Sequence, residues 1–202
     1  MSSSIVRSML TISLSFILVA SGPAFAAQQS KTGKVEAPEF LDGPVPRIQW
    51  VMTTPDTLIV RDSYRVTVRT TFGMTVAALV VSTPALENQR VKGLIIDLGE
   101  NTKAGEDSGS SILDIEEAES LSQSLASMID LAAKGGRDDR HGTEMSFVTL
   151  GGFVVNLRID GRGPKAYVQA GRMNAIRTSI EISELRTVKT LVDDALALLA
   201  DK

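Results

Sequence analysis

Hydrophobic and polar residues alternate along the first half of the chain, as they do in a strand with one buried face. In YRVTVRT (64–70), Tyr64, Val66 and Val68 are separated by Arg65, Thr67 and other polar residues. A period of two places these sets on opposite faces of an extended chain. The RDS sequence before this segment predicts a hairpin turn, and the polar run 100–111 predicts a surface loop. We expect further strands at RIQWVMT (47–53), TLIV (57–60), TVAALVVS (75–82) and VKGLIIDL (91–98).

The apolar spacing changes to three and four residues after position 112, which is typical of an amphipathic helix. The same spacing returns near the C-terminus, at an offset of 67 residues, and predicts a second helix about 18 residues long. Asp114 and Glu117 have capping-box spacing at the first helix start, whereas Glu181 is a poorer cap for which Ser183 could substitute. The matched positions are Ile115, Ala118, Leu121, Leu125, Met128, Ile129 and Ala132 with Ile182, Leu185, Val188, Val192, Ala195, Leu196 and Leu199.

The strands repeat as well. RVTVRTTFGMTVAALVV (65–81) can be laid over TEMSFVTLGGFVVNLRI (143–159) at an offset of 78, and VKGLIID over KAYVQAG (165–171). Two amphipathic helices resemble each other by chance, but strands and helices in the same order favour a duplication over coincidence. We therefore predict an α+β protein built as a tandem repeat. Each repeat is a three-to-four-stranded antiparallel sheet unit followed by one amphipathic helix.

The repeat sets the expected domain organisation. A first sheet and helix occupy 47–134, a connecting loop 135–142, and a second sheet and helix 143–202. One small sheet under a single helix leaves apolar area exposed, so two copies gain by burying each other. They can do so by joining sheets edge to edge or by packing their helices together.

This order of elements resembles the topology of single-stranded-nucleic-acid-binding proteins of the whirly and PC4-like families. The resemblance is carried by SILDIEEAESL, TSIEISELRTV and the GGFVVNL strand (151–157), and it covers nearly all of 57–200. It implies a whirly/PC4-like topology. No nucleic-acid-binding motif of those families is present, so the resemblance transfers no binding residue and no function.

The N-terminus predicts export. Arg7 precedes an apolar run (8–20) too short to cross a bilayer comfortably, and Ala24-Phe25-Ala26 fits a signal-peptidase site. We expect residues 1–26 to be a cleaved signal peptide and 27–46 a flexible linker, with an uncleaved anchor as the alternative. After cleavage we expect no membrane span, and a periplasmic or secreted location.

The net charge and the absence of cysteine exclude several classes of partner and of chemistry. The chain has a net charge of −3, and removal of the leader leaves 20 basic and 24 acidic residues, a net of −4. General binding to nucleic acid is therefore disfavoured, because phosphates demand a basic surface. The absence of cysteine excludes disulfides, cysteine nucleophiles and thiolate metal sites.

Candidate catalytic chemistry is sparse. The single histidine, His141, lies near Asp138 and Asp139 in GGRDDRHGTE (135–144), and the three could form a weak metal site or an acid–base pair. The glycines and aspartates favour a solvated connection in which they supply turn conformations. GRGP (161–164) lacks a P-loop lysine, and Asp160-Gly161 predicts a hairpin turn. We expect no catalytic residue, no cofactor and no metal site.

One set of polar residues suggests a ligand surface. Arg61, Arg65 and Arg69 share parity in an extended chain, and Asn156 and Arg158 alternate with apolar residues, as Tyr167 and Gln169 do. If the helices cover the apolar faces, these side chains line the opposite face. Arginine beside an aromatic ring can bind an anionic or stacking ligand, although a solvated sheet face also has this composition. The candidate binding residues are Arg65, Arg69, Arg158, Tyr167 and Gln169.

The sequence favours a non-catalytic binding or structural module of the periplasm or extracellular space. One alternative is a binder of an anionic polymer or small ligand on the Arg/Tyr face. Another is a hydrolase-type enzyme that uses acidic residues or His141. We expect partners to be another protein or a second copy of the chain.

Overall fold

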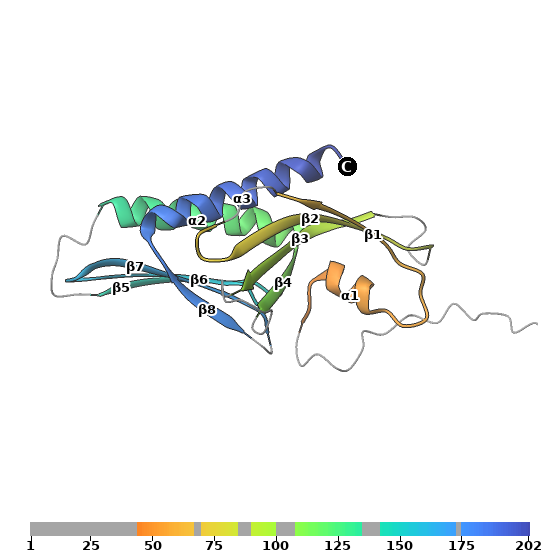
Figure 1. The fold of residues 1–202 in the computed structure, drawn as a ribbon, viewed down its shortest axis with the longest axis horizontal. Coiled ribbons are helices and arrows are strands. Elements are labelled where there is room, and N and C mark those ends of the chain that lie inside the picture. Colours follow the sequence, from red (N-terminus) through yellow and green to blue (C-terminus); the bar gives the residue numbers. More distant parts are fainter. Residues whose placement is uncertain (1–43, 67–69, 85–89, 100–107, 135–141, 173–174) are drawn as a thin grey trace, which may run out of the picture. The chain divides into compact units, whose positions relative to one another are not determined.

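The chain forms two four-stranded antiparallel sheets, each followed by a helix (Figure 1). This confirms the predicted α+β fold class. The computed structural model describes residues 44–66, 70–84, 90–99, 108–134, 142–172 and 175–202.

The first sheet contains β1 to β4 in sequence order. A short helix precedes it, and a long helix follows directly from its last strand. The elements are α1 (Arg47–Thr53), β1 (Val60–Arg65), β2 (Met74–Ser82), β3 (Arg90–Gly99), β4 (Ser108–Asp114) and α2 (Ile115–Lys134).

The second sheet contains β5 to β8, also in sequence order, and a second long helix follows its last strand. Its elements are β5 (Thr143–Val148), β6 (Val154–Asp160), β7 (Gly163–Ala170), β8 (Ile176–Ile180) and α3 (Ile182–Ala200). The predicted turn at Asp160-Gly161 joins β6 to β7, where the Arg162 N–H donates to Asp160 Oδ1 at 2.9 Å.

The helix alignment is confirmed. Five positions on each helix are buried at the predicted offset of 67 residues, and they form one stripe toward a common core. The pairs are Ala118 and Leu185, Leu121 and Val188, Leu125 and Val192, Met128 and Ala195, and Ala132 and Leu199.

The strand alignment is wrong by one residue. Thr70 Oγ1 accepts the Met74 N–H at 2.7 Å, and Thr149 Oγ1 accepts the Phe153 N–H at 2.9 Å. These equivalent turns lie 79 positions apart, not 78. A slip of one residue would exchange the two faces of a strand. The sequence of β2 does not show which residues belong to which face, because most residues on both faces are apolar and buried.

The third strands also shift, by two residues. Met74 pairs with Leu98, and the register that pairs Val154 with Gln169 sets Phe153 opposite Ala170. Leu98 and Ala170 are 72 positions apart, whereas the sequence alignment used 74. An even shift leaves the predicted faces of β7 unchanged.

Each helix packs partly on the sheet of the other repeat. α3 packs on β2 and also contacts β1 and β3, while α2 contacts β5 and β6 in addition to β3 and β4. The two helices pack against each other (Figure 1). One apolar cluster contains residues of both repeats. Helix packing thus joins the two halves.

Two glutamates make matching contacts between the repeats. Glu117 at the start of α2 accepts the N–H of Leu150 from the second repeat. Glu184, its equivalent in α3, accepts the hydroxyl of Thr71 from the first. The two contacts are reciprocal, because each glutamate binds a residue of the other repeat and the two partners, Leu150 and Thr71, are equivalent at the offset of 79 residues.

The helix caps differ from prediction. Glu181 caps α3 through a complete capping box with Glu184, so Ser183 is not needed as a substitute. At the start of α2, Glu117 accepts the Asp114 N–H at 3.2 Å, whereas the Asp114 carboxylate binds elsewhere.

The segment RIQWVMT forms α1, not the predicted strand. Pro46 precedes it without a capping side chain, and Asp114 supplies the cap: its carboxylate accepts the N–H groups of Arg47 and Ile48 at 2.6 and 2.8 Å. The apolar side of α1 packs on Leu79 and Val81, which face away from α2 and α3. A cap contributed from 67 positions away leaves no local signal.

Two further boundaries are corrected. β1 runs through the RDS sequence that predicted a turn, and it begins at Val60, so TLIV is not a separate strand. β4 begins at Ser108, inside the predicted loop 100–111, of which 100–107 lie outside the described residues. Polar residues occupy these strands because both lie at sheet edges.

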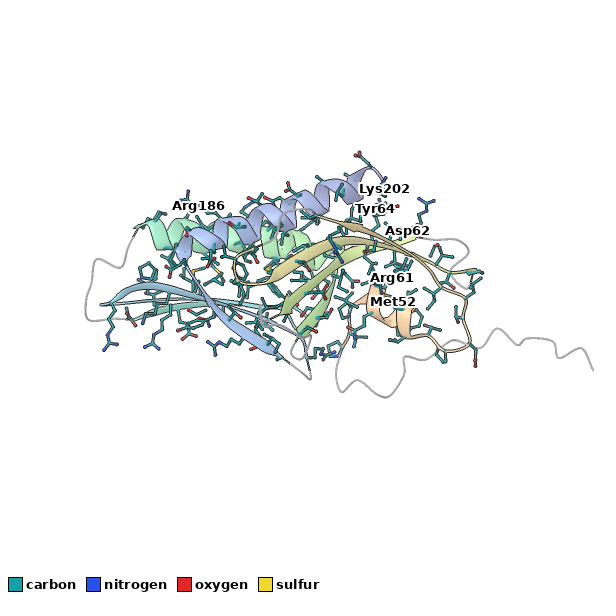
Figure 2. All side chains as sticks on the ribbon, viewed as in Figure 1. Met52, Arg61, Asp62, Tyr64, Arg186 and Lys202 are labelled. Carbon is teal, nitrogen blue, oxygen red and sulfur yellow. The ribbon has the colours of Figure 1, made fainter. Side chains whose placement is uncertain are left out.

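The C-terminal end of α3 is fixed to the first sheet. Lys92 Nζ donates to the Leu199 carbonyl at 2.9 Å, and Arg90 Nη1 to that of Lys202 at 3.1 Å. The Lys202 ammonium lies 4.8 Å from the ring centroid of Tyr64 (Figure 2). Cations at a helix C-terminus interact favourably with its dipole.

Glycines allow close approach where the two sheets meet. A Cβ atom on Gly151 would lie 1.9 Å from the Ile112 carbonyl oxygen, and one on Gly109 would lie 2.1 Å from that of Ala170. β4 of the first sheet therefore lies against the turn between β5 and β6 and against the end of β7. Among the described residues, no helix combines the length and apolar character needed to cross a bilayer.

Candidate functional site

The face of the second sheet that points away from α2 and α3 is here called the outer face. The strand register arranges its side chains in three rows from β5 to β8. The middle row is polar and contains the aromatic ring, while the third ends in an arginine. The rows are Glu144, Arg158, Lys165; then Ser146, Asn156, Tyr167, Ser179; then Val148, Val154, Gln169, Arg177.

An arginine stacks on the tyrosine of this face. The Arg177 guanidinium carbon lies 4.5 Å from the centroid of the Tyr167 ring. The sequence analysis does not include Arg177 among the candidate residues. Alternation in IRTSI (176–180) nevertheless predicts its side chain on the exposed face of the strand, because Ile176 and Ile180 occupy the other face and are partly or fully buried. Stacking holds the guanidinium against the sheet while its N–H groups remain donors for a ligand.

A shallow hollow surrounds this pair. It has a volume of about 110 Å³ and is lined by Val154, Asn156, Tyr167, Gln169 and Arg177, together with Val168. Amide, guanidinium and aromatic groups therefore converge on one spot.

Two side chains of the first row, Glu144 and Arg158, already have partners outside that row. Asn156 Nδ2 donates to Glu144 Oε1 at 2.7 Å, and Arg158 Nε lies 3.6 Å from Asp160 Oδ2. The Arg158 side chain is 59% exposed, so this ion pair is weak and a ligand anion can compete for the guanidinium.

Three predicted binding residues share the outer face: Arg158, Tyr167 and Gln169. Arg65 belongs to the other sheet, where it pairs with Ala77 on the side that α1 partly covers. Arg61, four residues before Arg65, lies on the same face of β1, where it pairs with Val81. Arg69 and His141 lie outside the described residues.

The corresponding positions of the first sheet are apolar. Ala77, Leu79 and Ile112 take the places that Asn156, Arg158 and Ser179 take in the second sheet. The first set packs near or under α1, whose cluster includes Leu79 and Ile112. The duplicated sheets have thus diverged: the positions of β2 and β4 that lie beside α1 are apolar in the first sheet, whereas their equivalents in the second sheet are polar.

Positive charge is concentrated in the strands of the second sheet, and negative charge in α2. Residues 154–180 contain five cations and one anion, Asp160, a net of +4 in a chain whose total is −3. α2 contains four acids and one lysine, a net of −3. The cations are Arg158, Arg162, Lys165, Arg172 and Arg177.

Among the described residues, two carboxyl groups have shifted pKa values, and both make contacts between structural elements. Burial raises the pKa of Glu117, with the Asp114 charge adding to the effect and the N–H groups of Asp114 and Leu150 opposing it. Burial acts to raise the pKa of Asp193, but hydrogen bonds from Lys189 and Ser122 outweigh it and lower the pKa.

Asp193 and its partners join α2 to α3. Lys189 Nζ and Ser122 Oγ each lie 2.5 Å from its carboxylate oxygens. Within the part of the chain that the structure describes, no group of three or more His, Asp or Glu side chains could hold a metal ion.

No protein-family model, curated protein or solved structure matches this chain. The whirly/PC4-like resemblance therefore stays a prediction.

Proposed function

We propose that this protein is an exported, non-catalytic binding module that binds an anionic ligand on the outer face of the second sheet. The observation that carries the proposal is the Arg177–Tyr167 stack within a segment of net charge +4. The N-terminal signal-peptide pattern supports export.

The difference between the two sheets supports the outer face of the second sheet as the ligand-binding surface. Polar and charged residues have been placed on the second sheet where the first has apolar residues near α1. A guanidinium held on an aromatic ring loses less conformational freedom on binding than a free one, which favours recognition of carboxylate, sulfate or phosphate groups.

The spacing of the cations favours an extended anion. Lys165 and Gln169 stand at opposite ends of the face, about 13 Å apart at the rise of a strand. Arg177 pairs with Gln169, so its cation and that of Lys165 are separated along the strands by a similar distance. A polymer can contact both, whereas a small anion contacts one.

Heparin, as a model polyanion, tests the proposal. We expect the chain to be retained on immobilised heparin at about 50 mM salt and released by added salt, because screening weakens exposed charge contacts. Arg177→Ala and Tyr167→Ala should each weaken binding about fivefold, the effect of losing about 1 kcal/mol.

Arg186→Ala is the matched control. It removes the same charge from an exposed position on α3, in the helix layer (Figure 2). No retention at low salt, or equal loss in Arg177→Ala and Arg186→Ala, would contradict the proposal.

A further inference from the structure

The two described sheets have four edge strands, and three of them are protected against pairing with another chain. A Cβ atom on Gly109 of β4 would lie 3.1 Å from the Ile176 nitrogen of β8, so these two edges lie against each other. β1 carries Arg61, Asp62 and Arg65, and charged side chains on an edge strand oppose pairing. The remaining edge is that of β5.

β5 has few features that oppose pairing. It has no proline, and Glu144 is its single charged residue. Met145 and Phe147 pack against the core but remain partly exposed, and Val148 is 66% exposed. In the part of the chain that the structure describes, β5 pairs with β6 alone. An unprotected edge of this kind is a template for a further strand.

The register shows which backbone groups of β5 point to the free edge. The Thr149 N–H donates to the Phe153 carbonyl at 2.9 Å, at the end of the β5–β6 ladder. The backbone groups of an antiparallel strand point alternately to its two sides. The odd-numbered residues of β5 therefore direct their N–H and C=O groups to β6. Those of Glu144, Ser146 and Val148 point to the free edge.

We propose that β5 pairs with β5 of a second copy, antiparallel and centred on Ser146. This register sets Ser146 opposite itself and Glu144 opposite Val148, and each of these pairs exchanges two backbone hydrogen bonds. Met145 of one copy then faces Phe147 of the other, and a thioether beside an aromatic ring is a favourable contact. The register also keeps the two Glu144 carboxylates apart, and like charges directly opposite each other are destabilising.

The pairing joins the two outer faces into one surface, and this part rests on the proposed function. The side chains of Glu144, Ser146 and Val148 lie on the outer face, so both outer faces lie on the same side of the joined sheet. Two Tyr167 rings are then five strand spacings apart, or about 24 Å. A polyanion of that length contacts both Arg177–Tyr167 stacks, whereas a shorter one contacts one.

Sedimentation equilibrium of the full chain tests the pairing without any ligand. A six-residue strand buries little area, so we expect a weak dimer that is populated at about 100 µM. Val148→Glu sets a carboxylate opposite Glu144 of the other copy and should raise the dissociation constant of the dimer about tenfold. Val148→Lys sets an opposite charge there and should leave the constant unchanged or lower it.

Val60→Glu is the matched control. Val60 is 50% exposed on β1, so this substitution adds the same charge to the other exposed edge strand and leaves β5 intact. A chain that stays monomeric at about 100 µM would overturn the proposal. Equal weakening of the dimer by Val148→Glu and Val60→Glu, or by Val148→Glu and Val148→Lys, would also overturn it.

A disulfide tests the centre of the register. The chain has no cysteine, so Ser146→Cys introduces one thiol in each copy. The Cα atoms of a hydrogen-bonded pair are about 5.5 Å apart, within the range that a disulfide spans. Ser179→Cys places a thiol in the same row on β8, and its intermolecular disulfide should form at least about tenfold more slowly. Equal rates would contradict pairing at Ser146.

Heparin fragments separate this inference from the proposed function. A fragment longer than about 24 Å should bind at least about threefold more tightly than a shorter one, because it contacts both copies. Ser146→Pro removes an N–H at the free edge and none of the β5–β6 bonds, and it should abolish both the dimer and this advantage. An equal advantage in both proteins would contradict the joined surface. A dimer with no heparin retention would contradict the proposed function and leave the strand pairing standing.

Discussion

At the scale of single residues, Glu117 is a carboxylate whose burial is only partly compensated. It accepts hydrogen bonds from the N–H groups of Asp114 and Leu150. The second of these bonds connects the two repeats. Burial still raises its pKa above the ordinary value of 4.5, because the charged form loses solvation. Its ionisation is therefore disfavoured in the folded state.

Glu117→Gln should change how stability depends on pH. A raised folded-state pKa means that the wild type is favoured below the unfolded pKa and loses that stability as pH rises through the folded pKa. Glutamine keeps an acceptor oxygen but does not ionise. The free energy of unfolding of the variant, relative to wild type, should therefore increase as pH rises from about 4 through the titration of Glu117.

Denaturant unfolding at a series of pH values measures this effect. Glu116→Gln removes an exposed carboxylate from the neighbouring position and serves as the control. If the two variants differ from wild type by the same pH-independent amount, burial of Glu117 does not govern its titration.

At the scale of elements, α1 depends on a residue far away in sequence. The helix has seven residues and no capping side chain of its own, so it is too short to be stable alone. The Asp114 carboxylate at its N-terminus and the apolar surface of β2 hold it in place.

Asp114→Ala should loosen α1 and lower the free energy of unfolding by about 1–2 kcal/mol, the usual cost of losing an N-cap. The fluorescence of Trp50, the single tryptophan of the chain, should shift toward that of a solvated indole because Trp50 lies in α1. Asp62→Ala, at an exposed position of β1, should leave both quantities nearly unchanged. Equal effects of the two substitutions would show that Asp114 does not cap α1.

The elements that the sequence predicts correctly are those with a periodic pattern facing one core. The helix stripes at an offset of 67 and the alternation of β6 and β7 are of this kind. The pattern of residues 47–53 predicts a strand where α1 forms, because seven residues contain too few helical turns to show a period and the cap of α1 is not local. The register of β2 was misplaced because Ala77, Leu79 and Val81 are as buried as the residues between them.

Part of the candidate site could be predicted because it lies on strands with a regular alternation. Arg158, Tyr167 and Gln169 follow from alternation within their strands. The sequence places Arg65 in the first sheet, and its grouping with these residues rests on alternation alone, which does not show whether the faces of two sheets form one surface. Arg177 was missed because its partner Tyr167 comes from the neighbouring strand.

At the scale of the whole molecule, the account depends on mutual burial of the two repeats. α3 belongs to the second repeat by sequence but packs on β2 of the first, and one apolar core contains residues of both. Such a molecule should unfold as one cooperative unit.

Equilibrium unfolding of Leu191→Ala, followed by Trp50 fluorescence and far-UV circular dichroism, tests this most directly. Leu191 is fully buried in α3, and its truncation should cost about 2–5 kcal/mol. Trp50 lies in the first repeat, near the opposite face of the sheet that α3 covers. We predict that both signals shift together to the same lower midpoint. A Trp50 transition that stays at its wild-type midpoint while the circular dichroism transition moves or splits would contradict the account.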